Sequence, residues 1–193
     1  MAEVRSTFSL RPGNAAPEFQ LPAPDEKLHD LHELRGNEGL LIVFACNHCP
    51  YVIHLADQVG GLASEIETEG VNTVAISSND IEKYPQDAPE HMVTFAEQHG
   101  WNFPYLFDET QEVAKAYGAA CTPDFFLFDR ELRLYYAGQF DHSRPKSGQT
   151  PTGADLRAAI KSMLAGEEAP ERPFPSSGCN IKWKAGSEPP YFA

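Results

Sequence analysis

Two cysteines separated by two residues, Cys46 and Cys49, have the type and spacing to do chemistry in this 193-residue chain. Thiols at this spacing can form a reversible disulfide, which opens and closes by thiolate attack through a mixed disulfide with a partner. The pair follows an apolar run over residues 40–45 and precedes Pro50, which is tolerated in the first turn of a helix. The sequence therefore predicts a redox-active disulfide at a junction between a buried strand and a helix.

The segment after the pair carries apolar residues at helical spacing and predicts a helix over residues 50–69. Cys46 then lies at or just before the N-terminus of this helix. Because unpaired backbone N–H groups and the helix dipole favour a thiolate there, we predict that Cys46 is the nucleophile and that Cys49 reaches back to it. His48 is a predicted modulator, since an imidazolium beside the pair would favour the thiolate further.

Two other interpretations of the pair remain open. A C-x-x-C can be half of a zinc site, or two buried cysteines without a chemical role, although no second C-x-x-C and no His-x-x-x-His follows. Cys121 and Cys179 could join the pair in holding zinc or an iron–sulfur cluster, which would make the chain a metal-binding module. Their spacing matches no ligand motif, so the redox interpretation is preferred.

The composition of the chain excludes several classes of partner. With 28 acidic against 15 basic residues and a formal net charge of −13, we expect neither nucleic acid nor an anionic membrane as a partner. No segment has the length of an apolar membrane span, and residues 1–17 lack the apolar core of a signal peptide. Four cysteines are too few for a structural disulfide framework, so we expect a reducing, cytoplasmic location.

The order of the predicted elements indicates an α/β fold. The strand 40–45, the helix 50–69 and a strand at 71–77 form a β-α-β unit, which implies parallel strands with helices on the faces of the sheet. We predict one domain over residues 1–165 and a Pro-rich tail over residues 166–193 that wraps the same domain. The other predicted elements are a β-hairpin with a helical turn within 11–38, helices at 89–98, 112–117 and 155–164, and strands at 104–108, 121–129 and 132–140.

Four segments of the chain carry a family resemblance. They are Ala16-Pro17-Glu18-Phe19-Gln20-Leu21, Val43-Phe44-Ala45-Cys46-Asn47-His48-Cys49-Pro50, Phe107-Asp108 and Thr122-Pro123-Asp124-Phe125-Phe126-Leu127-Phe128-Asp129. In these segments the chain resembles the thioredoxin superfamily, and within it the peroxiredoxin-like branch of AhpC/TSA-related alkyl hydroperoxide reductases. The resemblance covers residues 10–165. It implies a thioredoxin-like fold, with a central mixed β-sheet flanked by helices and an N-terminal β-hairpin extension.

By this resemblance, Thr122-Pro123 matches the cis-proline site that lies beside the C-x-x-C pair. A cis X–Pro bond leaves the backbone of Thr122 free to hydrogen-bond an extended substrate chain, so these two residues are the implied substrate-binding residues. Without the family, Pro123 could equally be an ordinary trans proline at the start of a strand. Cys121, two positions before the proline, is implied to lie near the site.

The superfamily offers two mechanisms for the cysteines. In thioredoxin-like reductases and oxidases the first cysteine attacks and the second resolves, which implies these roles for Cys46 and Cys49. In peroxiredoxins the peroxidatic cysteine is often followed by proline, as Cys49 is by Pro50. The segment from Gly178 to Ser187 resembles a resolving-cysteine segment, so Cys179 or Cys46 would resolve a sulfenic acid on Cys49, within one chain or across a homodimer.

We rank thiol–disulfide exchange above peroxide reduction. The arginine that peroxiredoxins use beside the cysteine has no counterpart, because Pro123-Asp124 stand at its place, and peroxide activation without that donor would be poor. The expected partner is a protein dithiol or disulfide such as a thioredoxin or a reductase, with a peroxide as the substrate in the second mechanism. No cofactor is expected.

Overall fold

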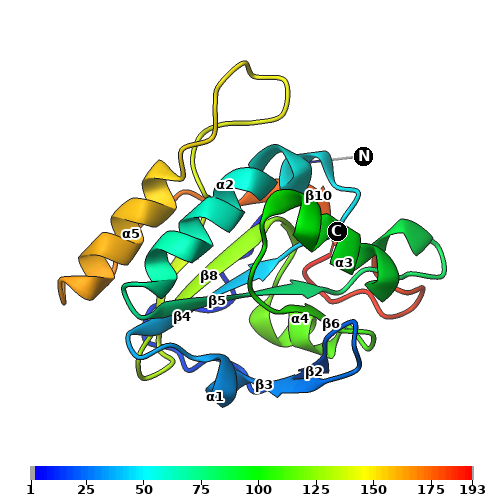
Figure 1. The fold of residues 1–193 in the computed structure, drawn as a ribbon, viewed down its shortest axis with the longest axis horizontal. Coiled ribbons are helices and arrows are strands. Elements are labelled where there is room, and N and C mark those ends of the chain that lie inside the picture. Colours follow the sequence, from blue (N-terminus) through cyan, green and yellow to red (C-terminus); the bar gives the residue numbers. More distant parts are fainter. Residues whose placement is uncertain (1–2, 193) are drawn as a thin grey trace.

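A computed structural model describes residues 3–192 and has a five-stranded sheet at its centre (Figure 1). The strand order is β6–β5–β4–β8–β9, in which β4, β5 and β6 are parallel and β8 and β9 continue antiparallel. The predicted central mixed sheet is therefore confirmed. Its strands are β4 (Gly39–Phe44), β5 (Val71–Ser77), β6 (Tyr105–Phe107), β8 (Asp124–Asp129) and β9 (Leu134–Gly138).

β4 is the central strand because it consists of glycine and apolar residues, all of them buried. Such a continuous run fits a strand that is covered on both faces. It pairs over its whole length with β5 on one side and β8 on the other, so that Phe44 lies opposite both Ile76 and Asp124. The chain leaves β4 one residue before Cys46, and the beginning of β8 lies beside this exit.

Helices cover both faces of the sheet, as predicted. α2, α3 and α5 pack on one face, and α1, α4 and the hairpin of β2 and β3 pack on the other (Figure 1). No helix within residues 3–192 combines the length and the apolar character needed to cross a membrane. The elements are β2 (Gln20–Pro22), β3 (Leu28–Asp30), α1 (Leu31–Leu34), α2 (Pro50–Glu67), the 3-10 turn η1 (Pro85–Asp87), α3 (Pro89–His99), α4 (Glu112–Tyr117) and α5 (Ala154–Leu164).

The tail after α5 contributes a strand to a second sheet. β10 (Ser177–Asn180) pairs antiparallel with β1 (Glu3–Arg5) along one edge and with β7 (Cys121–Thr122) along the other. The sequence predicted no regular structure in this tail, yet the first three residues of β10 are buried. A four-residue strand without apolar alternation is fixed by the strands it pairs with, so its own pattern could not predict it.

The strand predicted over residues 121–129 is divided at Pro123 into β7 and β8. Proline has no N–H to donate to a ladder, so the strand is interrupted there. The interruption lets β7 leave the central sheet and pair with β10, while β8 stays beside β4. The two halves of one predicted strand therefore belong to two sheets that meet next to the cysteines.

Candidate active site

The cysteine pair lies in the turn between β4 and α2. α2 begins at Pro50 and Cys49 is its N-cap residue, so Cys46 precedes the cap by three positions. The sequence predicted a helix from residue 50 with Cys46 at or just before its N-terminus; the helix does begin at Pro50, and Cys49 rather than Cys46 is the residue at its cap. Both side chains are buried, with 1% of Cys46 and none of Cys49 exposed.

Thr122 is the residue that both thiols of the pair contact. The Cys49 thiol donates to the backbone carbonyl of Thr122 at 3.1 Å, and Cys46 Sγ lies 3.5 Å from Thr122 Oγ1. The bond between Thr122 and Pro123 is cis, as the resemblance implied. Cys179 on β10 is the registered partner of Thr122 across the β7–β10 ladder. The structure thus brings the cysteine pair and the distant Cys179 around one residue.

The three thiols have opposite acidities. Hydrogen bonds from the Cys179 and Cys46 thiols hold the pKa of Cys49 well below its usual range, against the opposing effect of burial. The pKa of Cys46 is raised by its hydrogen bond to Cys49, by burial and by the negative charge of Asp87. The pKa of Cys179 is raised by its hydrogen bond to Cys49 and by burial. The direction of these shifts favours the thiolate on Cys49 over Cys46, whereas the hydrogen bond that the Cys49 thiol donates to the Thr122 carbonyl holds its proton; the role of Cys46 as the nucleophile stays a prediction.

His48 is held by a buried carboxylate. Its Nδ1 lies 2.6 Å from Asp87 Oδ2, its ring stacks on Tyr84 at a centroid distance of 5.5 Å, and its buried Nε2 has no hydrogen-bond partner. A ring nitrogen of His48 lies within 4.8 Å of Cys46 Sγ. The imidazole is thus close enough to act electrostatically on Cys46, the thiol farther from the helix.

Asp87 also fixes the backbone between the two cysteines. Its Oδ1 accepts hydrogen bonds from the backbone N–H groups of Asn47 at 2.9 Å and His48 at 3.2 Å, and its Oδ2 accepts one from Asn79 Nδ2 at 2.8 Å. The sequence reasoning did not identify Asp87 or Asn79. Because β4 and β5 are parallel neighbours, the loops that follow them begin at the same edge of the sheet. This relation could have pointed to the polar residues of the loop after β5.

A group of aromatic side chains also reaches the loop of the pair. The Tyr105 hydroxyl donates to Asn47 Oδ1 at 3.1 Å, and the Tyr105 ring lies 5.3 Å from that of Trp101. The indole N–H of Trp101 donates to the carbonyl of Ala56 in α2 at 2.9 Å. A chain of contacts therefore connects a residue between the two cysteines to a buried tryptophan.

Cys121 lies on β7 but takes no part in this cluster of hydrogen-bonded thiols. It is fully buried, and burial followed by the negative charge of Asp124 raises the pKa of its thiol well above the usual range. Its Sγ lies 3.6 Å from the carbonyl of Pro123, to which it can donate. The structure thus places Cys121 near the pair, with the environment of a buried, protonated thiol.

The potential metal ligands differ from the predicted set. Within residues 3–192, the three side chains whose donor atoms lie within 4.8 Å of one another are Cys46, His48 and Asp87. The four cysteines proposed from the sequence as an alternative ligand set do not meet this distance. Both carboxylate oxygens of Asp87 already accept hydrogen bonds from neighbouring groups, so this trio is better described as a hydrogen-bonded network.

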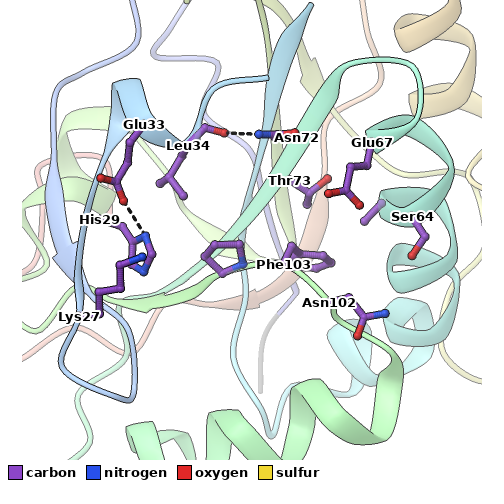
Figure 2. A pocket seen from close by; sticks show the side chains of 12 residues that line it. Lys27, His29, Glu33, Leu34, Ser64, Glu67, Asn72, Thr73, Asn102 and Phe103 are labelled. Atoms are coloured by element: carbon purple, nitrogen blue, oxygen red, sulfur yellow. Dashed lines mark hydrogen bonds and ion pairs between the residues drawn. The ribbon is translucent and has the colours of Figure 1, made fainter. Parts of the chain in front are cut away.

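A separate polar cavity of about 280 Å³ lies at the opposite end of the parallel strands, between the β2–β3 hairpin and the C-terminal half of α2 (Figure 2). In it His29 pairs with Glu33 at 2.8 Å, and the hydroxyl of Thr73 is buried without a partner. No cysteine lines this cavity. It is therefore distinct from the thiol cluster, which follows the carboxyl end of β4.

The fold is that of thioredoxin-like proteins. The solved structure of a putative thioredoxin from Neisseria meningitidis matches with a TM-score of 0.60 at 19% identity, over 81% of this chain and 95% of that chain. An uncharacterized conserved protein from Geobacillus kaustophilus matches with a TM-score of 0.91 at 48% identity, over 95% of this chain and 97% of that chain. The predicted thioredoxin-like fold is confirmed.

The family model described as the AhpC/TSA family matches residues 12–137, and the chain belongs to that family. A putative peroxiredoxin of Mycobacterium tuberculosis is 32% identical over 116 residues, which are 60% of this chain and 69% of the relative. The thiol-disulfide oxidoreductase ResA of Geobacillus thermodenitrificans is 26% identical over 122 residues, 63% of this chain and 66% of the relative. These relatives support a redox function on a thioredoxin fold.

Proposed function

We propose that this protein is a thiol–disulfide oxidoreductase whose redox-active pair is Cys46 and Cys49. The observation that carries the proposal is the convergence of both thiols on Thr122, with Cys49 at the N-cap of α2 and hydrogen-bonded by its neighbours. A thiolate is the attacking species in disulfide exchange, and these donors stabilise it on Cys49. The role of first nucleophile, assigned to Cys46 from the sequence, therefore passes to Cys49 in this proposal.

The reaction transfers two electrons in two steps. The Cys49 thiolate attacks one sulfur of a partner disulfide, so that a mixed disulfide forms and the second partner sulfur leaves as a thiolate that takes a proton. Cys46 then loses its proton and attacks Cys49, which releases the first partner sulfur and forms the Cys46–Cys49 disulfide. A dithiol donor such as a thioredoxin or a reductase returns the pair to the reduced state by the reverse sequence.

Insulin reduction with dithiothreitol as the donor tests this function. Turnover should require Cys46 and Cys49, because the first carries the resolving thiol and the second the attacking one. In Cys46→Ser/Cys179→Ser, where neither neighbouring thiol can resolve it, the mixed disulfide should accumulate and be visible by intact mass, whereas in Cys49→Ser it should not form. Full turnover in Cys49→Ser would refute the assignment.

A second candidate function is peroxide reduction by Cys49. It is supported by the lowered pKa of Cys49, by the proline that follows it and by the second thiol of Cys179 hydrogen-bonded to it. The thiolate would attack a peroxide oxygen to give a sulfenic acid and release water or an alcohol, and Cys179 or Cys46 would then form a disulfide with loss of water. Within the described chain, the side chains that hydrogen-bond Cys49 are thiols and Thr122, with no arginine among them.

A peroxide-consumption assay separates the two candidates. Peroxide turnover that survives Cys46→Ser and fails in Cys49→Ser would place peroxide reduction first. Comparison of Cys179→Ser with Cys46→Ser would then identify the resolving thiol. In this structure Cys179 reaches Cys49 within a single chain, so the proposal requires no homodimer.

A further inference from the structure

β10 lies along the edge of β7 in the manner of a bound peptide. The two strands are antiparallel, with Cys179 opposite Thr122 and Asn180 opposite Cys121, and the backbone N–H of Ile181 donates to the carbonyl of Ala120 at 3.2 Å. An extended segment that adds to an exposed strand edge is a common mode of peptide recognition. Here the added segment comes from the C-terminal tail of the same chain.

Cys179 lies beside Cys49. Cys49 is fully buried, and its sulfur has Cys179, Cys46, Thr122 and the backbone of Val52 as neighbours. Cys179 lies opposite Thr122 across the β7–β10 ladder, and the Cys49 thiol donates to the carbonyl of that same Thr122 at 3.1 Å. Of these neighbours, only Cys179 belongs to a segment, β10, that is part of neither the loop of the pair, β7 nor α2.

The residue before Cys179 is a glycine for a steric reason. A Cβ at Gly178 would lie 2.0 Å from the carbonyl oxygen of Thr122, a distance that backbone atoms cannot relieve without moving the strand. The close pairing of β10 with β7 therefore needs glycine at this position. Any other chain that pairs with β7 in the same register meets the same carbonyl.

We propose that β10 is an internal occupant of the site where a protein partner pairs with β7, and that such a partner reaches Cys49 by displacing it. The partner presents an extended segment with glycine immediately before its reactive cysteine, in the place of Gly178 and Cys179. This inference rests on the proposed disulfide exchange. It adds to that function the class of partner, a protein with an exposed Gly-Cys segment, and a gate that the partner must open.

The anchors of β10 show which contacts a partner must compete with. Before the strand, the Ser176 hydroxyl donates to the carbonyl of Gly138 at 2.7 Å. After it, the backbone N–H of Lys182 donates to Asn79 Oδ1 at 2.8 Å, and the N–H of Asp80 donates to the carbonyl of Lys182 at 2.8 Å. On its other edge β10 pairs antiparallel with β1 from Glu3 to Arg5, so displacement opens the β7 ladder between these two anchors and either breaks the β1 ladder or carries β1 along. Loosening β10 should accelerate this opening.

A single-thiol trap tests the gate in the full chain. In the Cys46→Ser/Cys179→Ser background, Cys49 can form a mixed disulfide that neither neighbour resolves. The probe is a short Ser-Gly-Cys-Asn peptide whose cysteine carries thionitrobenzoate. The Cys49 thiolate attacks the peptide sulfur, a new disulfide forms, and thionitrobenzoate leaves as a coloured thiolate whose appearance gives the rate.

Gly178→Ala in this background should raise the trapping rate by about tenfold, because it weakens the pairing that covers Cys49. Gly61→Ala is the matched control, since a Cβ there meets no atom within 4 Å, and its rate should stay unchanged. Ser176→Ala, which removes one anchor without a clash, should accelerate trapping by a smaller factor and serves if Gly178→Ala loses its fold by circular dichroism. Equal rates in the loosened variants and the control would overturn the gate.

The peptide sequence tests the partner class. In the Gly178→Ala background, a Ser-Gly-Cys-Asn probe should react several-fold faster than a Ser-Val-Cys-Asn probe, because valine meets the Thr122 carbonyl. Equal rates for the two probes would overturn the glycine requirement. The trapping experiment needs only the Cys49 thiol and no turnover. Equal trapping rates would therefore refute the displacement of β10 without bearing on insulin reduction. Normal trapping without insulin reduction would count against the Cys46–Cys49 pair alone.

Discussion

The loop before α2 and the strand β7 each bury a cysteine completely, and the two thiols respond in opposite ways. Cys49 has its pKa lowered by hydrogen bonds from neighbouring thiols, whereas Cys121, without such donors from the cluster, has its pKa raised by burial and by Asp124. Burial alone disfavours the thiolate in both regions. The comparison shows that the arrangement of donors around a sulfur, and not its depth, separates a thiol whose pKa is lowered from one whose pKa is raised.

The largest effect should come from removing the Cys49 thiol, with removal of the Cys121 thiol as the comparison. Cys49→Ser should lower insulin reduction by at least about 100-fold, because the attacking sulfur is lost. Cys121→Ser, the matched substitution on β7, should keep activity within a factor of about two, since that thiol stays protonated. An equally large loss in folded Cys121→Ser would break the comparison, as measured by initial rates at equal protein concentration.

The pH dependence of stability should sharpen the description of β7. Burial raises the pKa of Asp124 to about 6, against 3.8 without burial. The folded protein holds this proton longer than the unfolded chain, so the stability that this group contributes is fully present below pH 3.8 and is lost as the pH rises through 6. This group should account for a loss of roughly 2 kcal/mol, which denaturant midpoints from about pH 4 to about pH 7 would reveal.

Asp124→Asn should remove that component of the pH profile, because an amide does not titrate. Asp129→Asn, at the other end of β8 and partly exposed, is the control and should leave the component in place. An unchanged decline in Asp124→Asn would show that another group is responsible.

A smaller effect is expected at Asp87, whose charge helps to raise the pKa of Cys46. In the mixed disulfide Cys49 carries no charge and no longer raises the pKa of Cys46, but the negative charge of Asp87 still does. Asp87→Asn should therefore speed the release of a trapped partner at neutral pH by a few-fold, measured by the decay of the mixed disulfide. Asp57→Asn removes a similar aspartate–histidine pair on the surface, at His99, and should not change this rate.

The smallest effect is expected from the hydroxyl of Thr122, which lies 3.5 Å from Cys46 Sγ and lowers the pKa of that thiol. Thr122→Val should slow the resolving step by about twofold at neutral pH, whereas Thr122→Ser should preserve the rate. The Thr122 carbonyl, which accepts from the reduced Cys49 thiol, is unchanged in both variants because it belongs to the backbone. A faster resolving step in Thr122→Val would contradict this role.

Much of the fold could be predicted because its elements carry local signals. The apolar run of β4, the proline at the start of α2 and the glycine after α3 each have a sequence signal that acts within a few residues. β10 has no such signal, since its place depends on pairing with β7, which lies far earlier in the chain. The tail was therefore predicted as irregular.

The candidate site was predicted in part for the same reason. The spacing of Cys46 and Cys49 and the resemblance around Pro123 pointed to the right region of the fold. The relative acidity of the two thiols could not be predicted from their spacing, because it depends on Cys179 and Asp87, which the fold brings from distant segments. Sequence patterns predicted which groups react, and the acidity of those groups depends on tertiary contacts that the patterns do not contain.

The contacts from Asn47 through Tyr105 to Trp101 give the protein an intrinsic optical reporter. The indole of Trp101 is buried beside a tyrosine that is hydrogen-bonded to the loop between the two cysteines. We expect a disulfide that closes in that loop to change the surroundings of the tyrosine and, through it, of the indole. Tryptophan emission, with Trp183→Phe removing the contribution of the second tryptophan, should then follow the oxidation state of the pair without a label.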